Sequence, residues 1–174
     1  MLKYLIMDNA AASYWIYKEE VKKWIYEHFN ENANILDVGP GRGTYWELLH
    51  GKYKNIDAVE IYRPNIIDYK LLDKYRFVAN RNIVDMEYGK YDLAIFGDVL
   101  EHLTVEDAQK VLAYAVNKCK EVIVAVPYRY KQQGNENKYE EHIQNDLTHE
   151  IVLQRYPILK VLYKNDSYGY YIKR

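Results

Sequence analysis

Short apolar runs alternate with longer stretches of helical periodicity along most of the chain. The predicted strands cover residues 35–38, 55–61, 77–79, 91–96 and 121–126. The last of these runs is almost continuously apolar, which is typical of a strand buried on both faces. The spacing of apolar residues predicts helices over residues 13–29, 44–50, 65–75, 104–117 and 148–156. Strands that alternate with helices in this order predict a mainly parallel sheet with helices on both faces.

The C-terminal part of the chain has a different pattern. Residues 158–163 and 168–172 have the composition of strands, and only the short polar link 164–167 separates them. So short a link predicts an antiparallel hairpin, which brings the sheet to seven strands. Ser13 is expected to cap the first helix and Thr104 the helix that follows it, where a nearby acidic residue gives almost a capping-box arrangement.

Composition narrows the class of protein. The 174 residues are 49% hydrophobic, which predicts one folded domain. The net charge of −1 offers no general attraction to a phosphate backbone, so nucleic acid is an unlikely partner. The single cysteine, Cys119, excludes an internal disulfide and a cysteine-rich zinc site. The chain lacks an apolar run of about 18 residues and a typical leader at its start, so we expect a cytoplasmic protein without a membrane segment.

A glycine-rich segment, DVGPGRG over residues 37–43, lies between a predicted strand and a predicted helix. Glycines at that place let the backbone turn sharply and let a ligand lie against it. Glu60 ends the next predicted strand, where a carboxylate can accept hydrogen bonds from both hydroxyls of a ribose. The loop and the acid together predict a nucleoside site, and the alternative is a tight turn with a surface glutamate.

The spacing of the glycines separates two kinds of nucleoside ligand. A dinucleotide site has the pattern G-x-G-x-x-G and places a pyrophosphate at the helix N-terminus. Here the pattern is G-x-G-x-G and Asp37 precedes it. A carboxylate there would repel a pyrophosphate and suits a ligand with an ammonium group, so S-adenosylmethionine (SAM) is favoured over a dinucleotide.

With these motifs the chain resembles the class I SAM-dependent methyltransferases, in particular small single-domain members with a DVLEHL segment. The segments that carry the resemblance are ILDVGPGRG, VEI, NRNIVDM, YDLAIFGDVLEHL and VIVAVPY. The resemblance implies an α/β, Rossmann-like fold with a seven-stranded, mainly parallel sheet, an antiparallel C-terminal hairpin and helices on both faces. It implies one methyltransferase domain over residues 1–174, with an N-terminal helical cap over 1–30 and an acceptor-side insert over 128–147.

The resemblance also implies which residues bind the cofactor. These are Asp37, Gly39, Gly41, Gly43, Glu60, Asn82, Ile83 and Gly97. Asn82 stands where the family usually has an aspartate, and its side chain still allows a hydrogen bond to the adenine amino group.

Three residues with metal-binding or catalytic side chains, Asp98, Glu101 and His102, follow the fourth predicted strand. If they form a helical turn, all three share one face and suit a divalent ion. Similar segments bind a metal in the ubiquinone-pathway O-methyltransferases and the small-RNA 2′-O-methyltransferases, where a further histidine often completes the site; His142 or His149 could do so here. The alternatives are a metal-free active-site role and a purely structural one.

The polar and aromatic stretch 128–145 follows the fifth predicted strand and is expected to cover the methyl-acceptor side. Tyr139 and His142 are expected to point toward the methyl group, and Arg129 and Lys131 could meet an anionic group of the acceptor. The alternative is a surface loop. A short part of the stretch is similar to segments of methyltransferases from bacterial glycan and nucleotide-sugar pathways.

The predicted reaction is transfer of a methyl group from SAM to a hydroxyl of a sugar or another small metabolite, such as a glycan or a nucleotide-sugar. His102 or His142 is the candidate general base, and Asp98 is the third candidate catalytic residue. The alternatives are methylation of an RNA 2′-hydroxyl and a non-catalytic protein that binds SAM.

Overall fold

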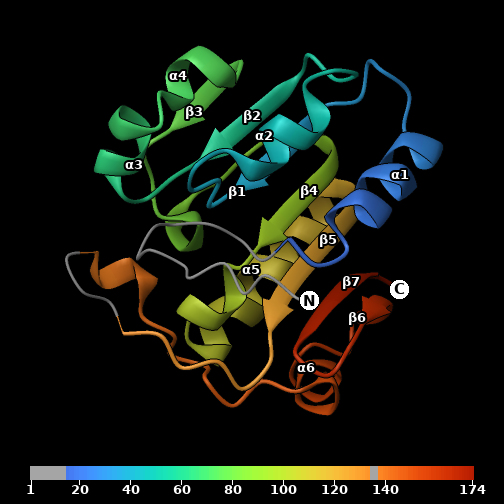
Figure 1. The fold of residues 1–174 in the computed structure, drawn as a ribbon, viewed down its shortest axis with the longest axis vertical. Coiled ribbons are helices and arrows are strands. Elements are labelled where there is room, and N and C mark those ends of the chain that lie inside the picture. The colour runs from blue at the N-terminus through green and yellow to red at the C-terminus, as the bar shows by residue number, and fades with distance from the viewer. Residues whose placement is uncertain (1–14, 134–136) are drawn as a thin grey trace, which may run out of the picture.

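The computed structural model describes residues 15–133 and 137–174, and in them seven strands form one mixed sheet (Figure 1). The strands are β1 (Ile35–Val38), β2 (Ile56–Val59), β3 (Phe77–Ala79), β4 (Tyr91–Gly97), β5 (Cys119–Pro127), β6 (Leu159–Lys164) and β7 (Tyr168–Lys173). Their order is β3-β2-β1-β4-β5-β7-β6. The five strands from β3 to β5 are parallel, and β7 runs antiparallel to both of its neighbours. The predicted fold class and the C-terminal hairpin are confirmed.

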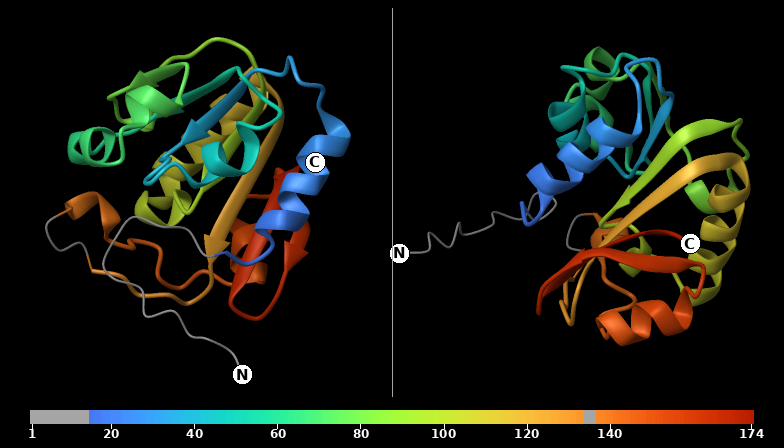
Figure 2. Two further views of the ribbon diagram at one scale, coloured as in Figure 1. Left: turned by 45° about the horizontal axis from the view of Figure 1, so that its top comes forward. Right: turned by 90° about the vertical axis from the view of Figure 1, so that its right-hand side faces the viewer.

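Helices cover both faces of this sheet (Figure 2). They are α1 (Lys18–His28), α2 (Thr44–Leu49), α3 (Arg63–Asp68), α4 (Leu71–Lys74), α5 (Val105–Lys118) and α6 (His149–Arg155), with short 3₁₀ helices η1 (Ile83–Asp85), η2 (Leu100–His102) and η3 (Lys138–Glu140). Apolar side chains of α1 to α4 pack on one face, and those of α5 and α6 pack on the other. None of the helices in the described ranges has the length and hydrophobicity that a membrane span requires.

Two predicted helices have different bounds in the structure, and positive φ angles explain both differences. The first helix begins at Lys18 and not at residue 13, because Tyr17 has a φ of 58° and residues 15–17 are not helical. Ser13 lies outside the described residues, and the N-cap position is occupied by Tyr17. The helix predicted over 65–75 is divided into α3 and α4 at Lys70, whose φ is 51°. A left-handed residue interrupts the helical hydrogen-bond ladder although the apolar periodicity continues across it.

The predicted cap of α5 is confirmed. The Thr104 hydroxyl accepts a hydrogen bond from the Asp107 backbone N–H at 3.1 Å and donates one to the Asp107 carboxylate at 2.8 Å. This cap fixes the start of α5 just after the turn that follows β4. The cap residues therefore lie at the same edge of the sheet as the glycine-rich loop.

The strand order reverses between β1 and β4, because the chain first builds β2 and β3 outward and then returns to the centre. Loops that leave the carboxyl ends of β1 and β4 diverge at this point, which is where open α/β sheets bind their ligands. The segment after β5 runs along the same edge (Figure 1). The topology therefore brings the loop after β1, the loop after β4 and the segment after β5 together at one edge of the sheet.

Candidate functional site

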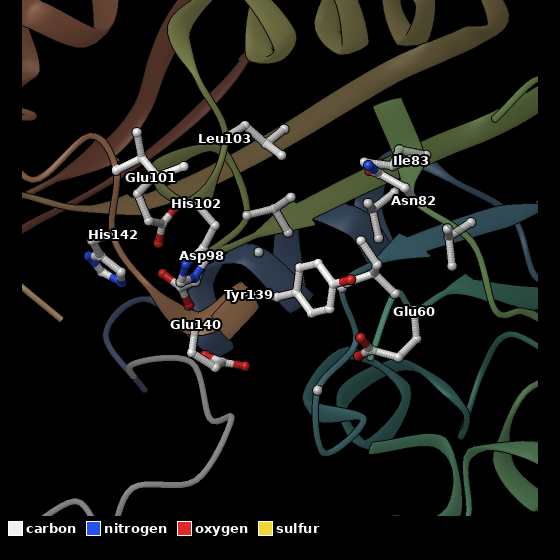
Figure 3. A pocket seen from close by; sticks show the side chains of 18 of the residues that line it. Glu60, Asn82, Ile83, Asp98, Glu101, His102, Leu103, Tyr139, Glu140 and His142 are labelled. Carbon is white, nitrogen blue, oxygen red and sulfur yellow. The ribbon is translucent and has the colours of Figure 1, made fainter. Parts of the chain in front are cut away.

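A cavity of about 310 Å³ lies at the carboxyl ends of β1, β2, β4 and β5. Figure 3 shows its side chains in two groups. The first group, the glycine-loop end, consists of Gly39, Gly41, Glu60, Asn82 and Ile83. The second group, the histidine end, consists of Glu101, His102, Glu140 and His142. Tyr139 lies between them.

The glycine-rich loop has the backbone that its composition predicts. Gly39, Gly41 and Gly43 have φ angles of 63°, 51° and 87°, a region that side chains other than glycine rarely adopt. A Cβ on Gly39 would also lie 2.9 Å from a methyl group of Val99. Gly39 and Gly41 line the cavity, whereas Gly43 lies outside its lining and forms the N-cap of α2. At Gly39 and Gly41 the loop thus presents bare backbone to anything held in the cavity, with Pro40 between them.

Asp37 is buried beneath this loop and does not line the cavity. One carboxylate oxygen accepts a hydrogen bond from the Tyr75 hydroxyl at 2.5 Å, and the other has no partner among the described residues. Burial raises the pKa of Asp37 to about 7, while the Tyr75 hydrogen bond and the charge of Lys18 act against the rise. In this structure Asp37 therefore packs under the glycine-rich loop and is separated from the cavity by it.

Glu60 lies at the end of β2, and its carboxylate faces the cavity (Figure 3). Its two oxygens accept hydrogen bonds from the Tyr62 backbone N–H at 2.8 Å and the Asn65 amide at 3.3 Å. Burial raises the pKa of Glu60, and these two hydrogen bonds oppose that rise. The carboxylate is held in place, and its remaining lone pairs are available to a ligand with hydroxyl groups.

Asn82 and Ile83 line the same end of the cavity. The Asn82 side-chain oxygen accepts a hydrogen bond from the Val84 backbone N–H at 3.1 Å and so caps η1. Ile83 is buried with an apolar surface toward the cavity. Ile83 thus offers an apolar surface and Asn82 an amide, and this combination suits a planar ring that contains nitrogen atoms.

The helical turn that would place Asp98, Glu101 and His102 on one face does not form. Asp98 has a φ of 58°, and the 3₁₀ helix η2 begins only at Leu100. Gly97, before it, has no room for a side chain because a Cβ would lie 2.2 Å from the Tyr45 ring. Asp98 therefore lies outside the helical turn of Glu101 and His102. It lines the cavity, and one of its oxygens accepts a hydrogen bond from Tyr168 at 2.6 Å.

The histidine end brings Glu101, His102 and His142 together. One side-chain oxygen or nitrogen of each lies within 4.8 Å of the others, and Asp98 is not part of this group. His102 Nδ1 is 3.0 Å from the Glu141 carbonyl oxygen, and His142 Nδ1 is 2.9 Å from the Tyr130 carbonyl oxygen. A carbonyl accepts only, so each Nδ1 carries the proton and each Nε2 presents a lone pair.

Glu101 adds a carboxyl group to the two imidazole lone pairs. It is fully buried, and neither of its carboxylate oxygens has a hydrogen-bond partner among the described residues. Burial and the nearby Asp98 charge raise its pKa well above the usual range. Burial also lowers the pKa of His102 and His142. Two neutral imidazoles and a carboxyl group without donors are suited to a cation.

The segment after β5 is held to this cluster by Gln144. The Gln144 amide donates to the Leu100 and Leu103 carbonyl oxygens at 2.8 and 3.0 Å, and its backbone N–H donates to the Glu101 carbonyl oxygen at 2.9 Å. These bonds place His142 against η2 with its ring 4.7 Å from the His102 ring, centre to centre.

Of the other residues predicted in the segment after β5 and in α6, one lies at the cavity. Tyr139 lines the cavity, whereas Arg129, Lys131 and His149 do not. His149 is bonded to Tyr171 instead, at 3.1 Å. The positively charged side chains of the segment therefore lie away from the cavity.

The sequence reasoning missed several residues of this site. Glu140 lines the cavity and accepts hydrogen bonds from Gln132 and Asn137, and burial raises its pKa. Lys18 and Tyr168 lie behind the cavity and were not singled out. Glu140 could have been predicted, because it is an acidic residue next to Tyr139. Lys18 gives no such signal, because it stands at the start of an amphipathic helix.

The chain matches no protein-family model and no curated protein sequence. It does match solved structures by its fold. A SAM-dependent methyltransferase from Clostridium acetobutylicum ATCC 824 is 14% identical, with a TM-score of 0.66 over 88% of this chain and 87% of that chain. Magnesium protoporphyrin IX methyltransferase from Synechocystis PCC 6803 with bound SAM is 12% identical, with a TM-score of 0.64 over 90% and 77%. The N-methyltransferase NodS from Bradyrhizobium japonicum WM9 is 11% identical, with a TM-score of 0.61 over 91% and 96%. The protein has the fold of SAM-dependent methyltransferases.

Proposed function

We propose that the protein is a SAM-dependent methyltransferase that transfers the methyl group to a hydroxyl of a small metabolite, such as a sugar or a nucleotide-sugar. One observation carries the proposal: a single cavity joins a glycine loop and a carboxylate at one end to a cluster of two imidazoles and a carboxyl group at the other. The glycine-loop end suits the nucleoside of the cofactor. The histidine end suits removal of the proton from a hydroxyl acceptor.

At the glycine-loop end, we assign Glu60 to the ribose hydroxyls and Asn82 and Ile83 to the adenine. Gly39 and Gly41 let the methionine part of SAM lie against the backbone. Asp37 and Gly43 would act by shaping the loop, because neither lines the cavity. Most of the rate enhancement would come from holding the acceptor oxygen in line with the methyl carbon and the sulfur.

At the histidine end, the donor set fits a divalent metal ion. Glu101, His102 and His142 would hold it, and the two unpartnered Glu101 oxygens are the observation that supports the fit. A bound divalent ion would lower the pKa of a hydroxyl group that it touched. If the protein works without a metal, the Nε2 of His142 or His102 would take the hydroxyl proton while the oxygen bonds to the methyl carbon and the carbon–sulfur bond breaks.

The acceptor would be a small molecule. Tyr139 and Glu140 offer an aromatic face and a carboxylate, which suit a molecule with both apolar faces and hydroxyl groups. Arg129 and Lys131 do not line the cavity, and Arg81 is the one lysine or arginine among its lining residues in the described part of the chain, which is little positive surface for a nucleic acid backbone.

A calorimetric titration with S-adenosylhomocysteine (SAH) tests the cofactor assignment, with an expected binding free energy on the order of −8 kcal/mol. Incubation with SAM and a panel of hydroxylated acceptors, with and without EDTA followed by Mn²⁺, tests the reaction and the metal. Preference for NAD over SAH would overturn the proposal. Turnover that persists in EDTA after the metal content is shown to be nil would remove the metal and leave the histidine base.

A further inference from the structure

Lys18, the first residue of α1, is a fully buried lysine that the proposed mechanism does not use. Its ammonium donates a hydrogen bond to the Tyr45 hydroxyl at 2.8 Å and lies 4.0 Å from the centre of the Tyr45 ring. Burial lowers the pKa of Lys18 to about 8, and the charges of Asp98 and Asp37 act against that fall. Lys18 therefore still carries a charge near neutral pH.

A series of hydroxyl groups connects this ammonium to the cavity. The Tyr45 hydroxyl is 3.1 Å from that of Tyr170, and Tyr168 donates to Asp98 at 2.6 Å. Tyr168 and Tyr170 lie on the same face of β7 with ring centres 5.5 Å apart. Burial raises the pKa of Tyr170, and side-chain hydrogen bonds with Tyr45 and Tyr168 oppose that rise. All three tyrosines are at most 3% exposed.

The hydrogen bonds at the two ends of this series have fixed directions. An ammonium can only donate, so Tyr45 accepts from Lys18, and either hydroxyl of the Tyr45–Tyr170 pair can be the donor between them. A carboxylate can only accept, so Tyr168 must use its proton toward Asp98. The hydrogen bond from Tyr168 orients the Asp98 carboxylate at the cavity end of the series.

Asp98 is the point at which this series meets the cavity. It has a left-handed backbone, lines the cavity, and has one buried oxygen without a hydrogen-bond partner in the described part of the chain. Figure 3 shows it beside His102, on the side toward Tyr139 and Glu60. A SAM molecule with its ribose at Glu60 and its methyl group toward the histidine end would bring its sulfonium close to Asp98.

We propose that Tyr168 and Lys18 are positioning residues for Asp98, orienting its carboxylate toward the positive sulfonium of SAM. The inference rests on the proposed function. Stability alone gives no reason for such a series, because apolar side chains of similar shape usually replace a buried ionic network without loss of stability.

Tyr168→Phe tests the end of the series nearest the cavity. It removes only the hydroxyl that donates to Asp98. The dissociation constants of SAM and SAH are measured by calorimetry, because SAM carries the sulfonium charge and SAH does not. We expect SAM binding to weaken about tenfold, the effect of losing one charge-assisted contact, and SAH binding to change by less than about threefold. Tyr171→Phe is the control, because its hydroxyl is bonded to Tyr128 and its ring packs on the opposite face of the sheet.

Lys18→Met tests the far end of the series, and the sign of its effect is informative. A distant positive charge that acted only through space would repel the sulfonium, so its removal would strengthen SAM binding. If Lys18 acts through the tyrosines, its removal leaves Asp98 without its buried counter-charge and weakens SAM binding selectively. Lys52→Met is the control, because Lys52 also lies over two tyrosine rings but donates to the carbonyl oxygens of Tyr26 and Phe29.

The double variant Lys18→Met/Tyr168→Phe completes the experiment. Because either substitution breaks the same series, the double variant should lose no more SAM selectivity than the larger single loss. A ratio of SAM to SAH affinity within about twofold of wild type in Tyr168→Phe, or stronger SAM binding by Lys18→Met, would overturn the inference. Absence of SAM and SAH binding to the wild-type protein would overturn the proposed function itself. If Lys18→Met does not fold, Tyr168→Phe alone decides the outcome.

Discussion

At the glycine-loop end of the cavity, the Glu60 carboxylate accepts hydrogen bonds from Tyr62 and Asn65. At the histidine end, neither oxygen of the fully buried Glu101 has such a partner among the described residues. Both carboxyl groups have a raised pKa because of burial. The hydrogen bonds from Tyr62 and Asn65 oppose this rise at Glu60, and at Glu101 its own backbone N–H acts against it.

The difference indicates what each end requires from a ligand. The glycine-loop end is complete in the protein alone, so it should bind a nucleoside by adding hydrogen bonds to a carboxylate that is already in place. At the histidine end no donor from another described residue bonds to the Glu101 carboxylate, and an uncompensated buried carboxylate is costly. It therefore requires a cation, or a proton on Glu101, to be stable.

Glu101→Gln should have the largest effect of the substitutions considered. The amide keeps the size of the side chain but removes its charge, so binding of Mn²⁺ measured by calorimetry should weaken about a hundredfold or more. Binding of SAH should stay unchanged. Glu106→Gln, at an exposed position on α5, serves as the control. Equal Mn²⁺ affinity in wild type and variant would mean that Glu101 does not bind the metal.

His142→Ala should lower turnover of the identified acceptor about a hundredfold or more, because it removes a metal ligand or the general base. SAH binding should remain within about twofold, because the glycine-loop end is untouched. His149→Ala is the matched control, since that histidine is bonded to Tyr171 and does not line the cavity. If His142→Ala keeps wild-type turnover, His102 becomes the residue to test.

Glu60→Ala should weaken SAH binding by roughly 1.5–3 kcal/mol, the value of a charge-assisted pair of hydrogen bonds. Calorimetry provides the measurement, and Mn²⁺ binding at the histidine end should not change. The two ends would then be independent. A parallel loss of Mn²⁺ affinity would contradict that independence.

The glycine-loop end was predictable because its residues are close in sequence or follow successive strands. The apolar run over Ile35–Val38, the glycines after it and Glu60 lie where the sequence places them. The histidine end was predicted only in part. Its grouping depends on the positive φ of Asp98, which nothing in the residue type indicates, and on His142 from a segment whose path is set by Gln144.

The burial of individual polar residues could not be predicted from the sequence either. Lys18 has the sequence context of an exposed helical lysine, and only the tyrosines that α2 and β7 bring to it make it a buried cation. The sequence contains twenty tyrosines. Which of them would line up between Lys18 and Asp98 depends on the strand order and could not be deduced from composition.

Asp37→Asn provides a pH test of the glycine-loop end. The pKa of Asp37 is about 7 in the folded protein and 3.8 is the ordinary value. Between these values the folded state holds a proton that the unfolded state releases, so the free energy of unfolding falls as the pH rises. The loss should be about 2 kcal/mol between pH 5 and pH 7, and Asp37→Asn should lack it.

Urea unfolding of SAM-free protein at pH 5 and pH 7 gives the measurement, and asparagine can still accept the hydrogen bond from Tyr75. Asp92→Asn is the control: hydrogen bonds from Lys120 and Asn34 lower the pKa of Asp92, so its contribution is lost only when the pH falls below the ordinary range. That variant should be destabilised equally at both pH values. If Asp37→Asn follows the same pH dependence as wild type, Asp37 is ionised throughout this window. The loop would then rest on a buried charge whose counter-ion is Lys18, and Asp37 and Asp98 would share one buried cation.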